Sequence, residues 1–227
     1  MLAAASLLHL LQLSSPSLPI GAYSYSQGLE TAIEKGLVNN ETNARRWIAD
    51  QLQQVVAHFE APMLWRLLHA FAELDRQAVQ EWTERFIAAR DTAEFRAETI
   101  QMGYSLGKLV ADLGISDPDL LACLQQLPEI PLPTALACAA VALNVPAEAA
   151  LLGMLFSWAE NQVLVCVKSV PLGQVAGQRL LLSLRPELEA AAAIAQTLAD
   201  TELSNWSPGL SLLSMQHEVQ YSRLYRS

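Results

Sequence analysis

Hydrophobic residues recur at spacings of three and four along nearly the whole chain, a period that predicts amphipathic helices. Proline, glycine and capping residues separate the helical segments, and no internal repeat is evident. The expected helices lie near residues 2–13, 27–35, 41–59, 62–74, 76–89, 92–113, 117–126, 134–143 and 147–169, and three more begin near Pro171, Pro186 and Pro208. The pattern predicts an all-α fold, a single-domain bundle of roughly ten helices over residues 1–227.

Composition agrees with this class and excludes one function. Alanine and leucine, both strong helix formers, are the commonest residues, and 52% of the chain is hydrophobic. A length of 227 residues suits one domain. The formal net charge is −9 and no Lys or Arg cluster offers a surface to phosphates, so the sequence argues against nucleic-acid binding.

The expected compartment is the cytoplasm. Cys123, Cys138 and Cys166 form no C-x-x-C pair and are expected to be reduced core thiols. The apolar start has no basic residue before Lys35, unlike a secretory signal. The most apolar later run, 149–159, is shorter than a bilayer span and is expected to be a buried helix rather than a membrane segment.

The sequence offers little chemistry for catalysis or metal binding. His58 and His69 would lie about 16 Å apart along a continuous helix, too far to share one ion. There is no H-x-x-x-H, E-x-x-H or C-x-x-C pattern, no G-x-S-x-G, and no Gly-Lys-Ser/Thr after the PIGAYSYSQG loop. We therefore expect a protein that is not an enzyme and holds no metal within a single chain.

A proline-stiffened loop precedes the second helix. It presents Tyr23, Ser24, Tyr25 and Ser26 just before Gln27. Tyrosine offers rigid contact area at low entropic cost, which suits a partner surface. The same hydroxyls could instead cap the following helix, and the sequence leaves the two interpretations open.

Two glycine pairs interrupt helical segments. They are Gly103 with Gly107, and Gly173 with Gly177, the second pair accompanied by Gln174 and Gln178. A glycine inside a helix costs roughly 1 kcal/mol relative to alanine, so each pair indicates a closely packed crossing. The crossing helix could belong to this chain, which is the commoner case, or to a second copy.

Residues 204–227 form a C-terminal tail that is expected to dock. Its apolar stripe, spaced by four, four and three residues, consists of Leu213, His217, Tyr221 and Leu224. Arg223 and Arg226 make it the only segment with a positive balance. Such a helix could dock on its own body or in a partner's groove.

Four ordered blocks resemble the urease accessory protein F (UreF) family over essentially the full chain. They are LLQLSSPSLPIGAYSYSQGLE at 10–30, RAETIQMGYSLGKL at 96–109, VKSVPLGQVAGQRLLLSL at 167–184 and SMQHEVQYSRLYRS at 214–227. The resemblance implies an all-helical, non-enzymatic adaptor that forms a homodimer. It implies as partners the accessory protein UreD (also called UreH), the nickel-carrying GTPase UreG and the urease apoprotein. No cofactor is implied to stay bound: the complex handles nickel, and the GTPase partner binds GTP.

The resemblance also assigns positions. Partner-facing residues of the first block and of the tail are Tyr23, Ser24, Tyr25, Ser26, His217, Glu218, Arg223, Leu224 and Tyr225. The block linked to the GTPase-facing surface contains Lys168, Pro171, Gly173 and Gln174. One departure is Tyr25, because many members have histidine there in a G-F-S-H-S pattern. Any part that this histidine plays in passing nickel is therefore not implied for this chain.

Two further hypotheses follow. Lys168 could orient or screen a loop of the GTPase, or it could simply be a favourable cation at a helix C-terminus. The competing function is a direct nickel metallochaperone. Because an ion needs several converging ligands, that function would require an intersubunit site that uses His217 or His9 twice.

Overall fold

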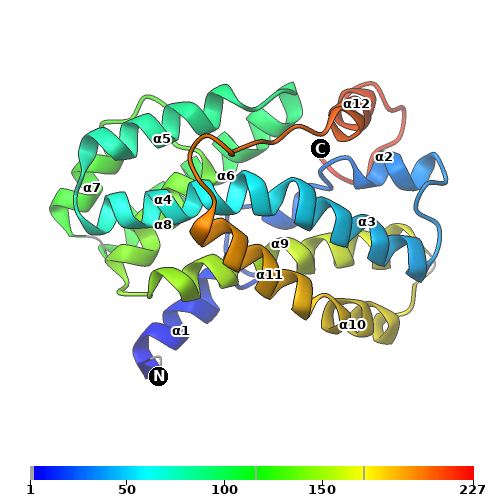
Figure 1. The fold of residues 1–227 in the computed structure, drawn as a ribbon, viewed down its shortest axis with the longest axis horizontal. Coiled ribbons are helices and arrows are strands. Elements are labelled where there is room, and N and C mark those ends of the chain that lie inside the picture. Colours follow the sequence, from blue (N-terminus) through cyan, green and yellow to red (C-terminus); the bar gives the residue numbers. More distant parts are fainter. Residues whose placement is uncertain (1–2, 116, 171) are drawn as a thin grey trace.

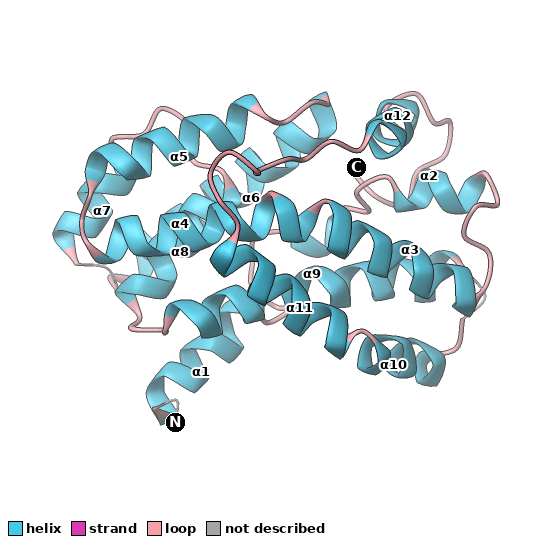
Figure 2. Ribbon diagram, viewed as in Figure 1, coloured by secondary structure: helices cyan, strands magenta, loops and turns pink. Residues whose placement is uncertain are grey.

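The computed structural model describes residues 3–115, 117–170 and 172–227, and these residues are helical with no β-strand (Figure 2). The prediction of an all-α fold is confirmed. The α-helices are α1 (Ala4–Leu13), α2 (Leu29–Glu34), α3 (Glu41–Gln54), α4 (Glu60–Ala72), α5 (Arg76–Ala88), α6 (Ala93–Leu113), α7 (Pro118–Gln125), α8 (Leu132–Ala142), α9 (Ala147–Ser169), α10 (Gln174–Ser183), α11 (Arg185–Thr197) and α12 (Pro208–His217). Two 3₁₀ turns are η1 (Ala22–Ser24) and η2 (Val56–His58). Each of the twelve segments expected to be helical contains one α-helix among the described residues.

Capping residues set the start of α3 as the sequence predicts, but its end differs. The Asn40 side chain accepts a hydrogen bond from the backbone N–H of Asn43, and Asn43 Oδ1 accepts one from the backbone N–H of Asn40. The helix expected over 41–59 is interrupted by η2 and resumes at Glu60. Pro62 then lies in the first turn of α4, where the lack of an N–H leaves no helical hydrogen bond unmade.

The second helix begins two residues later than predicted. Gln27 has φ 55° and Gly28 has φ 79°, both in the left-handed region, so the chain enters α2 only at Leu29. This turn directs the preceding loop across the body of the protein and places Glu30 in the first turn of α2.

The helical stripe predicted for the tail is wrong beyond α12. The helix ends at His217, and Tyr221 and Leu224 are exposed rather than buried (105% and 74%). The backbone N–H groups of Leu224 and Tyr225 donate to the carboxylate of Glu30 instead of to helical carbonyls. A side chain distant in sequence therefore replaces the helical hydrogen bonds of this segment.

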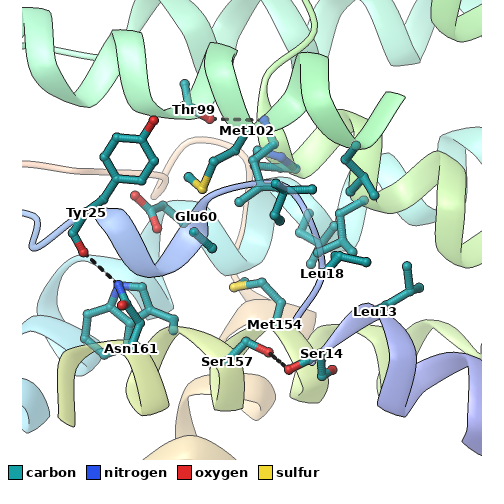
Figure 3. A pocket seen from close by; sticks show the side chains of 18 of the residues that line it. Leu13, Ser14, Leu18, Tyr25, Glu60, Thr99, Met102, Met154, Ser157 and Asn161 are labelled. Carbon is teal, nitrogen blue, oxygen red and sulfur yellow. Dashed lines mark hydrogen bonds between the residues drawn. The ribbon is translucent and has the colours of Figure 1, made fainter. Parts of the chain in front are cut away.

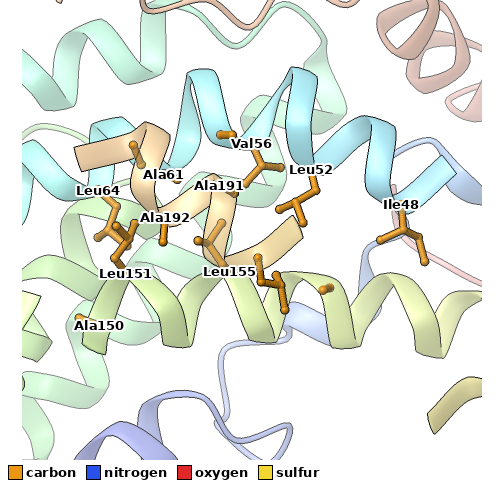
Figure 4. Close-up of a cluster of buried hydrophobic side chains, with 14 of the residues drawn as sticks. Ile48, Leu52, Val56, Ala61, Leu64, Ala150, Leu151, Leu155, Ala191 and Ala192 are labelled. Carbon is orange, nitrogen blue, oxygen red and sulfur yellow. The ribbon is translucent and has the colours of Figure 1, made fainter. Parts of the chain in front are cut away.

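The main core lies where α3, α4, α9 and α11 meet. Figure 4 shows aliphatic side chains from these helices pointing into one cluster, which includes Leu52, Leu64, Leu151, Leu155 and Ala191. Small alanines on α11 let it pack against both α4 and α9. In Figure 1, α1 lies at the lower edge of the molecule, whereas α12 lies beside α2 at the upper edge.

Helix α9 is long and apolar enough to span a membrane, by length and composition alone. The uninterrupted apolar run in the sequence ends before Glu160, but the helix continues to Ser169. Half of its most apolar window is buried inside the protein. Asn161 and Gln162 are also buried and donate hydrogen bonds to the loop before α2. These contacts are typical of a helix at the centre of a folded core.

Candidate interaction site formed by the tail and the first-block loop

The C-terminal tail lies on the body of its own chain. Helix α12 packs against α2 and α6, and the residues after it turn back toward the loop that precedes α2. Figure 1 shows the C-terminus between α12 and α2. The tail therefore takes the intramolecular docking position that the sequence left open.

His217 is the centre of this docking. Its side chain is 0% exposed, with Nε2 at 3.1 Å from Glu30 Oε2 and Nδ1 at 3.0 Å from Glu94 Oε1. A carboxylate facing each ring nitrogen is an arrangement that favours an imidazole donating from both, which is the cationic form. Arg223 adds a second cation, with Nη1 at 3.3 Å from Glu94 Oε1. Two carboxylates and two cations thus balance each other at the base of the tail.

Glu30 holds the tail by its backbone as well. Its Oε1 accepts from the N–H of Leu224 at 2.7 Å, and its Oε2 accepts from the N–H of Tyr225 at 3.0 Å. With His217, this one buried carboxylate receives three donors. Hydrogen bonds to a buried charge are among the stronger ones, so Glu30 fixes the path of the tail.

The last residues of the chain form hydrogen bonds with the loop of residues 14–27, which belongs to the first block and is called the first-block loop. The carbonyl of Ser227 accepts from the N–H groups of Ser26 and Gln27, and the N–H of Arg226 donates to the carbonyl of Ser24 at 2.8 Å. Ser227 Oγ donates to Glu98 Oε2 at 2.6 Å. Loop, tail and α6 are therefore joined by polar contacts.

Burial changes the titration of Glu98. Burial raises its pKa to about 7 from an ordinary 4.5, against the opposing effect of the hydrogen bonds from Gln27 and Ser227. The folded chain therefore binds a proton that the unfolded chain releases. The corresponding stability is fully present below about pH 4.5 and is lost as the pH rises through 7.

Replacing Glu98 with glutamine is expected to remove this pH dependence. The free energy of unfolding of the wild type should fall between pH 5 and pH 8 by about 1 kcal/mol or more relative to that of the variant, because glutamine does not titrate. Denaturant titrations of both proteins at the two pH values measure the difference. Identical pH dependence would show that Glu98 titrates normally in the folded protein.

The loop residues singled out in the sequence have different environments. Tyr25 and Ser26 are buried, and Tyr25 offers its carbonyl to Asn161 Nδ2 at 2.8 Å. Tyr23 is half-buried and donates its hydroxyl to Glu160 Oε2 at 2.5 Å. Burial and then Glu160 raise the pKa of Tyr23. Ser24 is half-buried, so the loop presents only part of its side-chain surface to solvent.

The third block lies next to the tail at the end of α9. Lys168, in the last turn of that helix, is exposed and places Nζ 5.5 Å from the ring centroid of Tyr225. Tyr225 is buried, its hydroxyl lacks a hydrogen-bond partner among the described residues, and burial raises its pKa to about 12. Gly173 and Gln174 are exposed at the start of α10, whereas Pro171 lies outside the described residues.

In each glycine pair only one glycine lies at a close contact, and in both cases the neighbouring atoms belong to this chain. A Cβ on Gly103 would lie 2.0 Å from the carbonyl oxygen of Ile130, and one on Gly177 would lie 2.5 Å from Val167 Cγ2. At Gly107 the nearest atom would be at an ordinary 3.5 Å, and at Gly173 nothing lies within 4 Å. Gln178 is exposed on α10.

Three residues of the docking cluster were not singled out from the sequence. Glu30 closes the first block and Glu98 lies in the second, while Glu94 is one helical turn before Glu98. Acidic residues at such positions ordinarily face solvent. The available signal was that two of the blocks contain Glu30 and Glu98, and the structure brings the first, second and fourth blocks together.

The outer side of the tail is apolar. Six large side chains on it are exposed, and together they are called the tail surface: Trp206, Leu212, Met215, Val219, Tyr221 and Leu224. Glu218 is exposed among them, and Arg223 is partly so. Thus the backbone and His217 attach the tail to the body, with Leu213 and Tyr225 buried beneath it, while the tail surface remains exposed.

Histidines do not gather into a metal site in residues 3–115, 117–170 and 172–227, where no group of three or more His, Cys, Asp or Glu side chains is placed to hold an ion. His217 would have to leave both carboxylates before it could bind metal in an intersubunit site. His9 keeps Nδ1 at 2.9 Å from the carbonyl oxygen of Leu143, which leaves Nε2 for other contacts.

Known proteins are similar to this chain over nearly its whole length. The sequence model of the UreF family matches residues 38–185. The chain is 79% identical over 224 residues to the urease accessory protein UreF of Janthinobacterium sp. (strain Marseille), which covers 99% of each chain. It is 65% identical over 222 residues to the UreF of Nitrosospira multiformis, which covers 98% of each. The family match does not include the loop of residues 14–27 or the tail, but it spans more than half of the chain, and the chain belongs to the UreF family.

Proposed function

We propose that this urease accessory protein is a non-enzymatic adaptor, which links a D/H-type accessory protein to a nickel-carrying GTPase during urease maturation. Nickel is the cargo of the assembly, the GTPase binds the GTP, and the urease apoprotein is the recipient. The proposal places the protein in the cytoplasm as a homodimer. The relatives carry the name urease accessory protein, and the buried thiols of Cys123, Cys138 and Cys166 suit a reducing compartment.

The observation that carries the proposal is the tail surface. Exposed apolar side chains on a monomer mark contact sites when they gather in one region. Here Val219, Tyr221 and Leu224 project from a segment whose backbone is fixed by Glu30. A segment that is already ordered before binding loses little further conformational entropy when it binds, which favours affinity. We assign this surface to the D/H-type partner.

Replacing Val219, Tyr221 and Leu224 together with serine should weaken binding of the D/H-type protein by roughly tenfold or more, since buried aromatic and aliphatic anchors dominate interfaces. The buried contacts of the tail are unaffected, because all three side chains point outward. Binding is measured by titration of the purified D/H-type protein onto each immobilised variant.

The matched control replaces Leu37, Tyr104 and Leu113 with serine. These side chains are also large, apolar and exposed, but they lie away from the tail on the α2–α3 connection and on α6. The control should bind like the wild type. Equal binding by all three proteins would remove the tail surface from the interface.

For the GTPase, the proposed contact is the end of α9 and the start of α10. Lys168 is exposed there with Gly173 and Gln174, and its ammonium lies over Tyr225 of the tail. The GTPase surface would therefore lie next to the D/H-type surface. An adjoining lysine could orient a loop of the GTPase or stabilise charge on its phosphates once water is excluded.

Lys168→Ala is expected to change the rate of GTP hydrolysis in the assembled complex by about tenfold while the complex still forms. Lys108→Ala, an exposed lysine on α6, is the control and should change nothing. Phosphate release and urease activation are measured for each. If hydrolysis and activation match the wild type, Lys168 is only a favourable charge at the C-terminus of α9.

A further inference from the structure

A cavity of about 130 Å³ lies beneath the loop of residues 14–27, between α6 and α9. Figure 3 shows Met102 and Met154 pointing into it from these two helices, with Leu18 of the loop beside them. Leucines of α1 and α8 complete an apolar end. An apolar cavity of roughly 150 Å³ in another protein takes up benzene, so this space suits a body of about six carbon atoms.

The opposite end of the cavity is polar, and most of its groups accept hydrogen bonds. Asn161 is buried, and its Oδ1 has no partner among the described residues because the amide donates from Nδ2 to Tyr25. Figure 3 shows the carboxylate of Glu60 directed toward the space between Tyr25 and Asn161. Glu98 lines the same end. Buried acceptors that converge on one space match a ligand that donates.

The charges at this end favour a cation. Glu60 is paired with Arg90, with Nη1 and Oε1 2.8 Å apart, and Arg90 also lines the cavity, its Nε buried without a partner among the described residues. Two carboxyl groups and one guanidinium line this end, so its formal charge is negative when both carboxyls are ionised. Glu98 receives hydrogen bonds from Gln27 and Ser227, both of which are neutral groups. A carboxylate as deeply buried as Glu98 is stabilised most by an opposite charge beside it.

We propose that this cavity is a binding site for a small organic ammonium ion. Its apolar body would lie between Met102, Met154 and Leu18, and its ammonium would donate to Glu98 and to Asn161 Oδ1. The site lies within one chain and involves neither the tail surface nor Lys168, so it is independent of the proposed adaptor function. The class of ligand follows from the acceptors, from the carboxylate of Glu98, which forms no ion pair within the described residues, and from the size of the cavity.

The titration of Glu98 is consistent with this site. Its pKa is raised to about 7 chiefly because burial removes water from the carboxylate; the charge of Glu60 adds to this effect and the charge of Arg90 opposes it. A bound ammonium would favour the ionised carboxylate and lower that pKa. Binding should therefore release a proton near pH 7 and tighten between pH 6 and pH 8.

Benzylamine is the probe, because it is cationic at pH 8 and has a six-carbon ring. It should bind the full chain at least about tenfold more tightly than toluene, which fills the same space without a donor. Phenylacetate, of similar size and opposite charge, should bind more weakly than toluene. Calorimetry in buffers of different ionisation enthalpy detects the proton release, and NMR shift perturbation of the Met102 and Met154 methyl groups locates the ligand.

Two variants and one control complete the test. Leu18→Trp should fill the cavity and abolish binding of both benzylamine and toluene, whereas Leu8→Trp, at an exposed position of α1, should leave both unchanged. Glu98→Gln should still bind toluene but lose the preference for benzylamine. The proposal is overturned if benzylamine fails to bind, if it binds no better than toluene, or if Leu18→Trp binds as the wild type does.

Discussion

Replacing Glu30 with alanine should release residues 218–227 from the body and lower the free energy of unfolding by about 3 kcal/mol. The substitution leaves Nε2 of His217 and the N–H groups of Leu224 and Tyr225 without their acceptor. A buried donor that lacks an acceptor is costly, so we expect the segment to detach rather than keep these three donors buried and unpaired. The result would separate the role of this buried carboxylate from that of the apolar core.

Trypsin provides the readout, because Arg223 lies inside the segment that Glu30 holds. Cleavage after Arg223, followed by mass spectrometry, should become roughly tenfold faster or more in the variant. Glu34→Ala, on the exposed side of the same helix, is the matched control and should stay within about 0.5 kcal/mol of the wild type. Wild-type protease resistance in Glu30→Ala would mean that the tail is held by other contacts.

Gly103→Ala is expected to cost about 3 kcal/mol or more. The new Cβ would lie 2.0 Å from the carbonyl oxygen of Ile130 and 2.5 Å from the carbonyl carbon of Pro131, and both are backbone atoms that no side-chain rotation can move. Helix α6 and the start of α8 would therefore have to separate. Thermal unfolding should show a midpoint lower by roughly 6–12 °C for a chain of this size.

Gly107→Ala, one turn along the same helix, provides a control of opposite sign. Its Cβ would meet Leu124 Cδ2 at an ordinary 3.5 Å, so the gain in helix propensity of about 1 kcal/mol should dominate. A destabilised Gly107→Ala together with a neutral Gly103→Ala would contradict the packing described for α6. It would assign the close approach to the wrong glycine.

Local signals in the sequence predicted most of the helices. Asn40 and Asp117 each accept a hydrogen bond from a backbone N–H in the first turn, as their residue types suggest. The errors lie where another part of the chain decides the backbone. The left-handed turn at Gln27 and Gly28 delays α2, and the acceptance of backbone N–H groups by Glu30 ends the helical path of the tail.

The docking cluster was less predictable for the same reason. The sequence identified His217 and Arg223 as unusual, but not the carboxylates of Glu30 and Glu94 that face them. The residues are separated by more than 120 positions, and acidic residues near helix starts are ordinarily explained by the helix dipole. Only the fold shows that these carboxylates bind the tail.

The tail surface could be predicted only in part. The sequence indicated an apolar, basic segment, but it placed Tyr221 and Leu224 on one helical stripe with Leu213 and His217. The structure separates the two pairs, because α12 ends at His217. Leu213 and His217 lie on the helix and are buried, whereas Tyr221 and Leu224 follow it and are exposed. The residues left outside are those now proposed for the partner.

The central claim is that the protein bridges two other proteins, and light scattering coupled to size-exclusion chromatography tests it most directly. The purified D/H-type accessory protein and the nickel-carrying GTPase are mixed with and without this chain. We expect one particle that contains all three when the chain is present, and no complex between the other two when it is absent. A complex of the two partners that forms equally well without the chain, or a chain that joins only one of them, would contradict the claim.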